Sequence, residues 1–338
     1  MKQNFAWIDR LKGIGIVAVV LGHIYPPSIS NLLFLWHMPL FFLISGFLFR
    51  IDADKRSYLA GKVVHLLVPY VAFLLLLNTF DIVFFVLSGD IHELARLTAR
   101  MLLGGRYLTG WTGVFWFVTC LFLTQQFANW IFPRFKGKLL WLLVILMLCL
   151  AFATSSYLSA YKLPLNIDKV LFSIPLFFLG WKARSSNWTE SKSIFLITAI
   201  AAVLGLLLVH FEMVDTIDMK RSFYGTEFLS VFFAVCIANS LMHICKMISE
   251  GGLVGRLLSN LGKASMAIMF LHQAINLGLQ TLGYQSFSIR AIAALMIPYL
   301  FYCVCVRFRF TNAFFLGARS DFVSYFPRYG QSSTIKLD

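Results

Sequence analysis

The chain has 338 residues, of which 59% are hydrophobic and only 13% are charged, and its mean hydropathy is +0.78. Soluble domains carry roughly 25% charged residues, so this composition excludes an ordinary soluble domain. The net charge of +14 does not indicate a nucleic-acid-binding protein, because the Lys and Arg residues lie in short clusters between apolar runs rather than on one basic face. That arrangement is typical of a membrane protein.

Ten apolar runs are predicted to be spanning helices, since a span needs about 20 mostly apolar residues. In chain order they are 13–30, 32–50, 63–88, 112–133, 139–157, 169–183, 193–211, 227–247, 264–284 and 289–307. The first two are joined by a tight turn at Pro26-Pro27-Ser28, and the third is long enough to contain a break. The loop 89–111 has apolar residues at helical spacing and could carry a short helix. The sequence therefore predicts an all-α, polytopic integral membrane protein with about ten transmembrane helices.

The distribution of Lys and Arg predicts the orientation. If the N-terminus is inside, the inner segments hold 21 of these residues and the outer segments hold 8. Inner loops of membrane proteins carry the excess of positive charge. We therefore expect a multi-pass protein of the bacterial inner (plasma) membrane with both termini in the cytoplasm. One membrane domain is expected over residues 1–310, followed by a basic cytoplasmic tail at 311–338.

Neither a metal site nor a disulfide framework is predicted. The six cysteines fall inside or at the edges of apolar runs, without a C-x-x-C spacing, and no H-E-x-x-H motif is present. The first apolar run also lacks an A-x-A-like cleavage site, so no cleaved signal peptide is expected.

Two histidines in the first hairpin are candidates for chemistry. Lys12 and His23 are eleven residues apart, which at about 100° and 1.5 Å per residue places them on one helix face roughly 16 Å apart. His37 lies in the outer half of the second run, so the short hairpin could bring both imidazoles into one pocket. Ionisable groups in spans are costly and often functional, and histidine exchanges protons near neutral pH. The alternative is a structural histidine that bonds a neighbouring carbonyl.

The residues of this hairpin also carry a resemblance. The runs Ile8 to Ile14, Val19 to His23 and His37 to Phe47 resemble the membrane acyltransferase family 3. Within it they are most similar to the fucose 4-O-acetylase-like and surface polysaccharide O-acetyltransferase branch. Individually weaker matches follow in the expected order over residues 5–310: Leu66-Leu67-Val68-Pro69-Tyr70, Trp116-Phe117-Val118, Ser173 to Gly180, and Leu261 to His272.

The resemblance implies a ten-helix fold, an acyl-CoA donor from the cytoplasm and a sugar acceptor on the outer side. It predicts transfer of acetyl from acetyl-CoA to a hydroxyl of a cell-surface glycan or lipid-linked oligosaccharide. Membrane lipids are further expected partners, nucleic acid is not, and the oligomeric state is left open. His23 matches the essential histidine of the family and would be the general base, with His37 assisting. The entrance of the binding site for the acyl-CoA donor is predicted to include Asp9, Arg10, Lys12, Lys62 and His65. The substrate cavity is predicted to include Trp116, Lys263, Ser265 and His272.

One departure from the family pattern concerns the donor site. Many members have an Arg-x-x-Arg pair before the Leu-Leu-x-Pro-Tyr element, whereas this chain has Lys62-Val63-Val64-His65. Lysine binds phosphate as a point charge, while paired arginines would grip it bidentately. Coenzyme A would then be held by other cations, such as Arg50, Lys55 and Arg56, or the donor site would be altered, or these cations would only set the topology.

Other activities and another mechanism are also compatible with the sequence. The protein could be a non-catalytic polysaccharide exporter, or it could transfer succinyl rather than acetyl. A covalent acyl-histidine relay is an alternative to direct transfer.

Overall fold

The computed structural model describes residues 6–327, apart from the side chains of Asn187 and Trp188. Within that range all elements are helices, with no strand. Seven helical segments of the described chain are long and apolar enough to span a membrane: Pro27–Leu48, Lys55–Leu77, Gly110–Ile131, Gly137–Ala160, Lys192–His210, Leu229–Met247 and Phe287–Arg307. The prediction of an all-α polytopic membrane protein is confirmed.

Each of the ten predicted runs is largely helical. They correspond in order to α1 (Ala6–Ile24), α2 (Pro27–Phe34) with α3 (His37–Leu48), α5 (Val68–Leu77) with α6 (Thr79–Ser88), α8 (Trp116–Ile131), α9 (Gly137–Ala160), α10 (Val170–Ser185), α11 (Lys192–His210), α12 (Leu229–Met247), α14 (Ser265–Thr281) and α15 (Phe287–Arg307). Four of these helices are not among the seven segments, one of them being α6, which has only 10 residues. α1 carries three charged residues, and α10 and α14 have only 16 and 17 residues.

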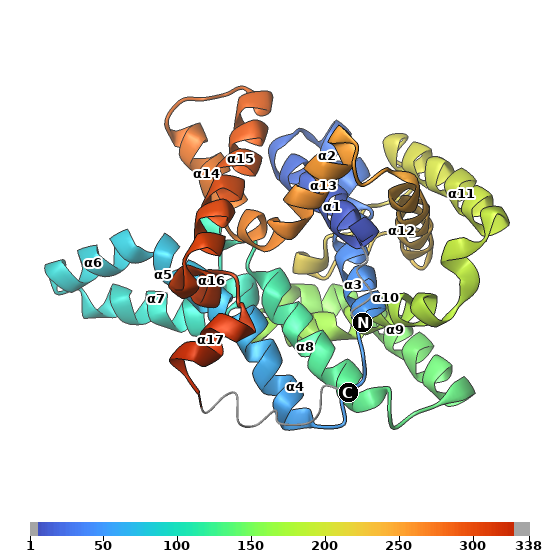
Figure 1. Cartoon of the computed structure of the whole chain (residues 1–338), viewed down its shortest axis with the longest axis horizontal. Coiled ribbons are helices and arrows are strands. Elements are labelled where there is room, and N and C mark those ends of the chain that lie inside the picture. The colour runs from blue at the N-terminus through green and yellow to red at the C-terminus, as the bar shows by residue number, and fades with distance from the viewer. Residues whose placement is uncertain (1–5, 328–338) are drawn as a thin grey trace.

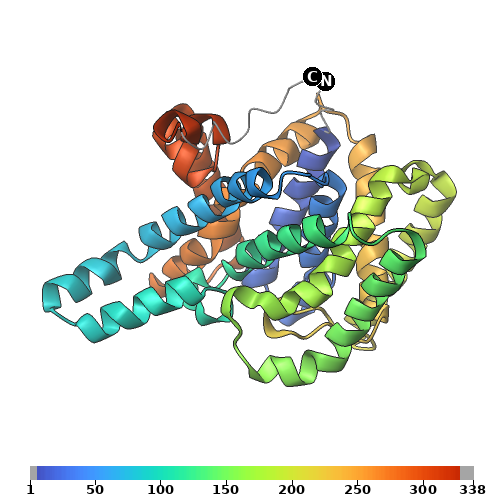
Figure 2. The ribbon, with the colours of Figure 1, turned by 90° about the horizontal axis from the view of Figure 1, so that it is seen from below.

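The long third run is broken, as its length suggested. It continues from α4 (Lys55–Lys62) through a π-helical turn at Val63–Leu67 into α5, which ends where the Asn78 side chain donates to the carbonyl of Leu74 at 2.7 Å. The loop 89–111 does contain a helix, α7 (Ile91–Leu103), whose first turn is capped by Asp90. Figures 1 and 2 show α6 and α7 projecting together as a hairpin from the rest of the molecule.

Helices at the centre and at the periphery differ in burial. In α9, α11 and α15, between 17% and 28% of the most apolar window is buried, against 67% for Pro27–Leu48 and 72% for Gly110–Ile131. Leu142, Ile197 and Ile292 on the three peripheral helices are each more than 60% exposed. Such apolar surface is stable only against lipid. Figure 2 shows α1 and α3 surrounded by the remaining helices.

Glycines set the closest helix contacts in the core. A Cβ added to Gly46 of α3 would lie 1.9 Å from a backbone oxygen of α10, and one on Gly180 of α10 would lie 2.0 Å from a backbone oxygen of α3. α1 and α13 (Leu253–Lys263) meet in the same way at Gly13 and Gly262. Any larger residue would push these backbones apart, so the glycines fix the position of the hairpin that carries both candidate histidines.

The segment after residue 308 packs against the helices before it. α16 (Arg309–Phe315) and α17 (Arg319–Tyr325) follow α15, and Ala313 and Phe322 form a small apolar cluster with Val64. The predicted tail at 311–338 is thus partly helical, and its residues 328–338 lie outside the described part of the chain.

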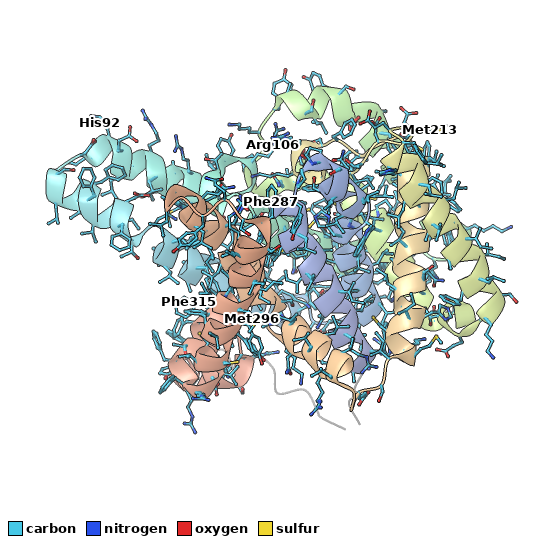
Figure 3. All side chains as sticks on the ribbon, turned by 90° about the horizontal axis from the view of Figure 1, so that it is seen from above. His92, Arg106, Met213, Phe287, Met296 and Phe315 are labelled. Atoms are coloured by element: carbon cyan, nitrogen blue, oxygen red, sulfur yellow. The ribbon has the colours of Figure 1, made fainter. Side chains whose placement is uncertain are left out.

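The connections between helices separate toward two ends of the molecule. In Figure 3, His92, Arg106 and Met213, all from segments predicted to be outside, lie toward one end, and Phe315, from a predicted inner segment, lies toward the other. The predicted topology requires this separation, because successive connections should lie on opposite sides of the membrane. The assignment of one end to the cytoplasm stays a prediction.

Candidate active site

Two pockets lie along the same central helices. The first, here called the histidine pocket, has a volume of about 620 Å³, and its lining includes His23, His37, Trp116, Arg106, Lys220 and Gln273. The second, here called the lysine pocket, has a volume of about 310 Å³, and its lining includes Lys12, Lys62, His65, Gln125, Lys263 and Ser265. Since α1 and α14 each contribute residues to both pockets, the pockets occupy different levels of one helix bundle.

Three histidines at the histidine pocket share one hydrogen-bond arrangement. In each, Nδ1 lies close to the carbonyl oxygen four residues earlier: 2.8 Å for His23 and Val19, 2.7 Å for His37 and Leu33, and 2.8 Å for His272 and Ile268. A carbonyl oxygen can only accept, so Nδ1 carries the hydrogen and donates it. In a neutral ring, Nε2 is then left with its lone pair. Each histidine therefore makes the hydrogen bond expected of a structural histidine, and its Nε2 is still available to accept a proton.

His23 is at the centre of this group. Its ring centroid lies 5.2 Å from that of His272, at an interplanar angle of 71°. Phe34 touches both His23 and His37, with centroid distances of 5.8 Å and 4.9 Å. His272 is completely buried and its Nε2 has no hydrogen-bond partner among the described residues. His23 and His37 therefore face the pocket, and His272 stands behind His23.

Connecting segments between helices also line the histidine pocket. They contribute the charged residues Arg106, Lys162, Asp218, Lys220 and Arg221. The Lys220 ammonium donates to the carbonyls of Gly113 at 2.7 Å and Leu108 at 3.3 Å. Burial lowers the pKa of Lys220; Asp218 opposes this shift, and the neighbouring cations reinforce it.

A buried polar cluster ties two of these segments together. Lys169 forms an ion pair with Asp168 and donates to the Ser222 hydroxyl at 2.5 Å, and Ser222 donates to Asp168 at 3.1 Å. Asp168 and Lys169 are both buried. Because breaking a buried pair is strongly destabilising, the cluster holds the segment around residue 220 in place over the histidines.

The lysine pocket collects five of the residues predicted from the sequence: Lys12, Lys62, His65, Lys263 and Ser265. Its lining also includes Gln125, whose side-chain oxygen is buried without a hydrogen-bond partner in the described part of the chain. Asp9 lies 3.4 Å from the Lys12 ammonium as an ion pair at the edge of this group. Three ammonium groups and a free acceptor are suited to an anionic ligand that also carries amide N–H groups.

Arg10 is placed differently from the other donor-site candidates. Its Nε donates to the Cys245 carbonyl at 2.9 Å, and its Nη1 lies 3.7 Å from a Glu250 carboxylate oxygen. The side chain is buried and lines neither pocket. Its contacts join α1 to α12.

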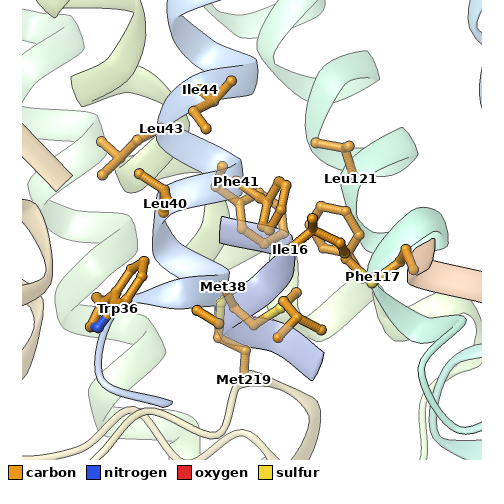
Figure 4. Packing of buried hydrophobic residues seen from close by; sticks show 14 of the residues in the cluster. Ile16, Trp36, Met38, Leu40, Phe41, Leu43, Ile44, Phe117, Leu121 and Met219 are labelled. Atoms are coloured by element: carbon orange, nitrogen blue, oxygen red, sulfur yellow. The ribbon is translucent and has the colours of Figure 1, made fainter. Parts of the chain in front are cut away.

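An apolar barrier separates the two pockets. It consists of Ile16, Phe41 and Phe117, and the two rings are 5.7 Å apart in an edge-to-face contact. Phe41 and Phe117 line the lysine pocket, whereas Met38 and Trp116, next to them on α3 and α8, line the histidine pocket. Figure 4 shows Ile16 between Phe41 and Phe117, with Met38 on the side of Met219.

Comparison with known proteins identifies the family. A family model described as "Acyltransferase domain", of acyltransferase family 3, matches residues 5–308. The chain belongs to this family. It is also 24% identical over 304 residues to Nodulation protein NolL of Sinorhizobium fredii (strain NBRC 101917 / NGR234), across 79% of this chain and 76% of that protein. No solved structure matches it. The resemblance inferred from the first hairpin is confirmed, and the protein is a membrane acyltransferase.

The predicted substrate cavity is divided between the two pockets. Trp116 and His272 lie with the histidines, whereas Lys263 and Ser265 line the lysine pocket. The sequence reasoning did not assign Gln125 or the cations of the connecting segments to the site. The available signal for the cations was their presence in outer loops, where Lys and Arg are usually sparse.

Proposed function

We propose that this membrane acyltransferase moves acetyl from cytoplasmic acetyl-CoA to a hydroxyl of a cell-surface glycan or its lipid-linked precursor, in a bacterial inner membrane. The observation that supports it best is the arrangement of His23. Its Nε2 is free to accept a proton, and His23 lies in a pocket separated by an apolar barrier from a second pocket lined by lysines. The proposal assigns the donor to the lysine pocket and the acceptor to the histidine pocket.

The residues of the lysine pocket fit coenzyme A. Lys12, Lys62 and Lys263 would neutralise phosphate groups at its mouth. The unpaired oxygen of Gln125 would accept an amide N–H of the pantetheine arm, and Met269 belongs to an apolar lining suited to its carbon chain. Substrate binding would thereby satisfy a polar atom that is otherwise buried without a partner.

His23 would act as the base in the transfer. Its Nε2 would accept the acceptor's hydroxyl proton as the acceptor oxygen bonds to the acyl carbon, and would return that proton to the sulfur of coenzyme A as the thioester bond breaks. His272 would hold the His23 ring in orientation, and His37 would assist from across Phe34. A positioned base of this kind contributes roughly 10²–10⁴-fold in rate.

The test compares surface glycans by mass spectrometry in cells that express the wild type, His23→Ala or the control His92→Ala. His92 lies on the projecting helix α7, away from both pockets. We expect acetylated glycan with the wild type and the control, and at least about a hundredfold less with His23→Ala at equal membrane abundance. Acetylation retained by His23→Ala would exclude His23 as base. An unacetylated glycan in wild-type cells, with export lost on deletion, would favour the exporter function instead.

A further inference from the structure

Positive charge is concentrated around the histidine pocket. Four of the eight Lys and Arg residues in the predicted outer segments line it: Arg106, Lys162, Lys220 and Arg221. They come from three connections that are distant in sequence. Outer segments of membrane proteins usually carry few cations, so the folding of half of them onto one pocket requires a reason beyond topology.

Two of the four other outer cations are neutralised by carboxylates within the fold. Lys169 is paired with the buried Asp168, and Arg96 is paired with Glu93 on α7. The four cations of the histidine pocket share a single carboxylate among the residues that line it. Asp218 is the one carboxylate in its lining, and it lies 3.6 Å from Arg221.

The partners of the pocket cations within the protein are mostly neutral. Lys220 donates to two backbone carbonyls, and Arg106 donates through Nη1 to the carbonyls of Ser159 at 2.7 Å and Tyr161 at 3.0 Å. Carbonyls orient these groups without removing their charge. Arg106 and Lys220 are half-buried, so holding them near each other and near the exposed Lys162 and Arg221 costs free energy, and a bound anion would offset that cost.

We propose that the acceptor is an anionic glycan, bound with its reacting hydroxyl at His23 and with a phosphate or carboxylate group among Arg106, Lys162, Lys220 and Arg221. This inference rests on the proposed function and narrows its substrate class. The anionic group is a diphosphate link to a lipid carrier or an acidic substituent of the sugar itself; both offer oxygens that Arg and Lys bind. A neutral sugar would leave this charge uncompensated.

The first experiment measures anion binding without requiring the natural acceptor. Full-length protein in phosphatidylcholine nanodiscs is titrated with inorganic pyrophosphate, glucose 1-phosphate, glucuronate or glucose, with coenzyme A present to fill the lysine pocket. Lys162→Gln and Arg221→Gln are the test variants, because both side chains are exposed and their loss does not disturb packing. Arg96→Gln is the matched control on α7.

We expect the wild type to bind at least one of the anions and not glucose. Each test variant should bind about tenfold more weakly, and Arg96→Gln should bind like the wild type. Affinity should also fall as salt rises. Absence of anion binding, or an equal loss in Arg96→Gln, would overturn the proposal.

The second experiment separates this inference from the proposed function. Acetyl transfer is measured with glycans isolated from the expressing cells. Lys162→Gln and Arg221→Gln should raise the acceptor KM about tenfold with little change in kcat. If the wild type acetylates a neutral glycan and these variants leave its KM unchanged, the proposed function stands and the anionic acceptor is wrong. If the wild type acetylates no glycan, both proposals fail.

A membrane phospholipid headgroup is the competing occupant. If phosphatidylglycerol nanodiscs abolish pyrophosphate binding while the variants leave the acceptor KM unchanged, the cations bind bilayer lipid, and the proposal is overturned. If the KM effects persist in both nanodiscs, the anion belongs to the acceptor.

Discussion

At the scale of single residues, Lys62 and His65 replace the arginine pair found in many members of the family, and the structure shows further cations beside them. Both residues line the lysine pocket together with Lys12 and Lys263. The proposed donor site therefore has several cations from different helices, and no single pair would have to supply the whole charge. A lysine-rich pocket can bind phosphates as a set of point charges.

Replacing Lys62 tests this role. Lys62→Ala should raise the KM for acetyl-CoA about tenfold with a smaller effect on kcat, because the phosphates lie far from the reacting carbonyl. His65→Arg should lower the KM, and the gain should shrink as ionic strength rises. Lys136→Ala, at an exposed lysine in the connection before α9, is the control and should behave as wild type. A higher KM in His65→Arg would show that this turn does not contact the donor.

At the scale of elements, close packing of α3 against α10 positions the second candidate histidine. Gly46 and Gly180 allow two backbones to touch where any Cβ would overlap a carbonyl oxygen. In a bilayer, apolar burial from water does not drive helices together, so close packing of this kind is a main source of association. The placement of His37 at the start of α3 depends on that contact.

Replacing Gly46 by any larger residue should therefore strongly destabilise the protein. Gly46→Ala places a Cβ 1.9 Å from the Phe177 carbonyl oxygen and should lower the free energy of unfolding by more than about 2 kcal/mol. Gly278→Ala in α14 is the matched control, since its Cβ would meet nothing within 4 Å. That variant should have an unchanged or slightly raised melting temperature in detergent. Equal melting temperatures for the two variants would contradict the packing argument.

At the scale of the whole molecule, the barrier of Ile16, Phe41 and Phe117 lies between the two pockets. In the proposed reaction, the acyl end of the donor passes between these side chains to reach His23. The barrier would otherwise keep water of the histidine pocket away from the thioester. Exclusion of water prevents hydrolysis of a reactive group in many transferases.

Removing a side chain of the barrier should allow acetyl-CoA to be hydrolysed without transfer of its acetyl group to the acceptor. Phe117→Ala should raise the hydrolysis of acetyl-CoA without acceptor about tenfold, because water would reach the thioester. Release of coenzyme A thiol by the purified protein measures this rate. Phe80→Ala, at an aromatic residue that is 87% exposed on the projecting helix α6, should leave it unchanged. A hydrolysis rate in Phe117→Ala equal to the wild-type rate would show that the ring is no barrier to water.

The sequence by itself determined the fold class, the helices of the ten apolar runs and the family, but not α4, α13, α16 and α17. Bilayer thickness sets the length of a spanning helix, and the backbone must form its hydrogen bonds within that helix. Both constraints require a continuous run of about 20 apolar residues, which can be recognised in the sequence. The short turn after α1 likewise made the shared pocket of His23 and His37 predictable. These features depend on residues that are close together in the chain.

Only the tertiary structure decided how the predicted site divides into two pockets. Lys263 and Ser265 face the lysine pocket, whereas His272, two turns further along α14, stands behind His23. Arg10 turned toward α12, and cations from three distant connections converged on the histidines. Lateral packing of helices depends on the shapes of side chains far apart in sequence, and neither hydropathy nor helical period contains that information.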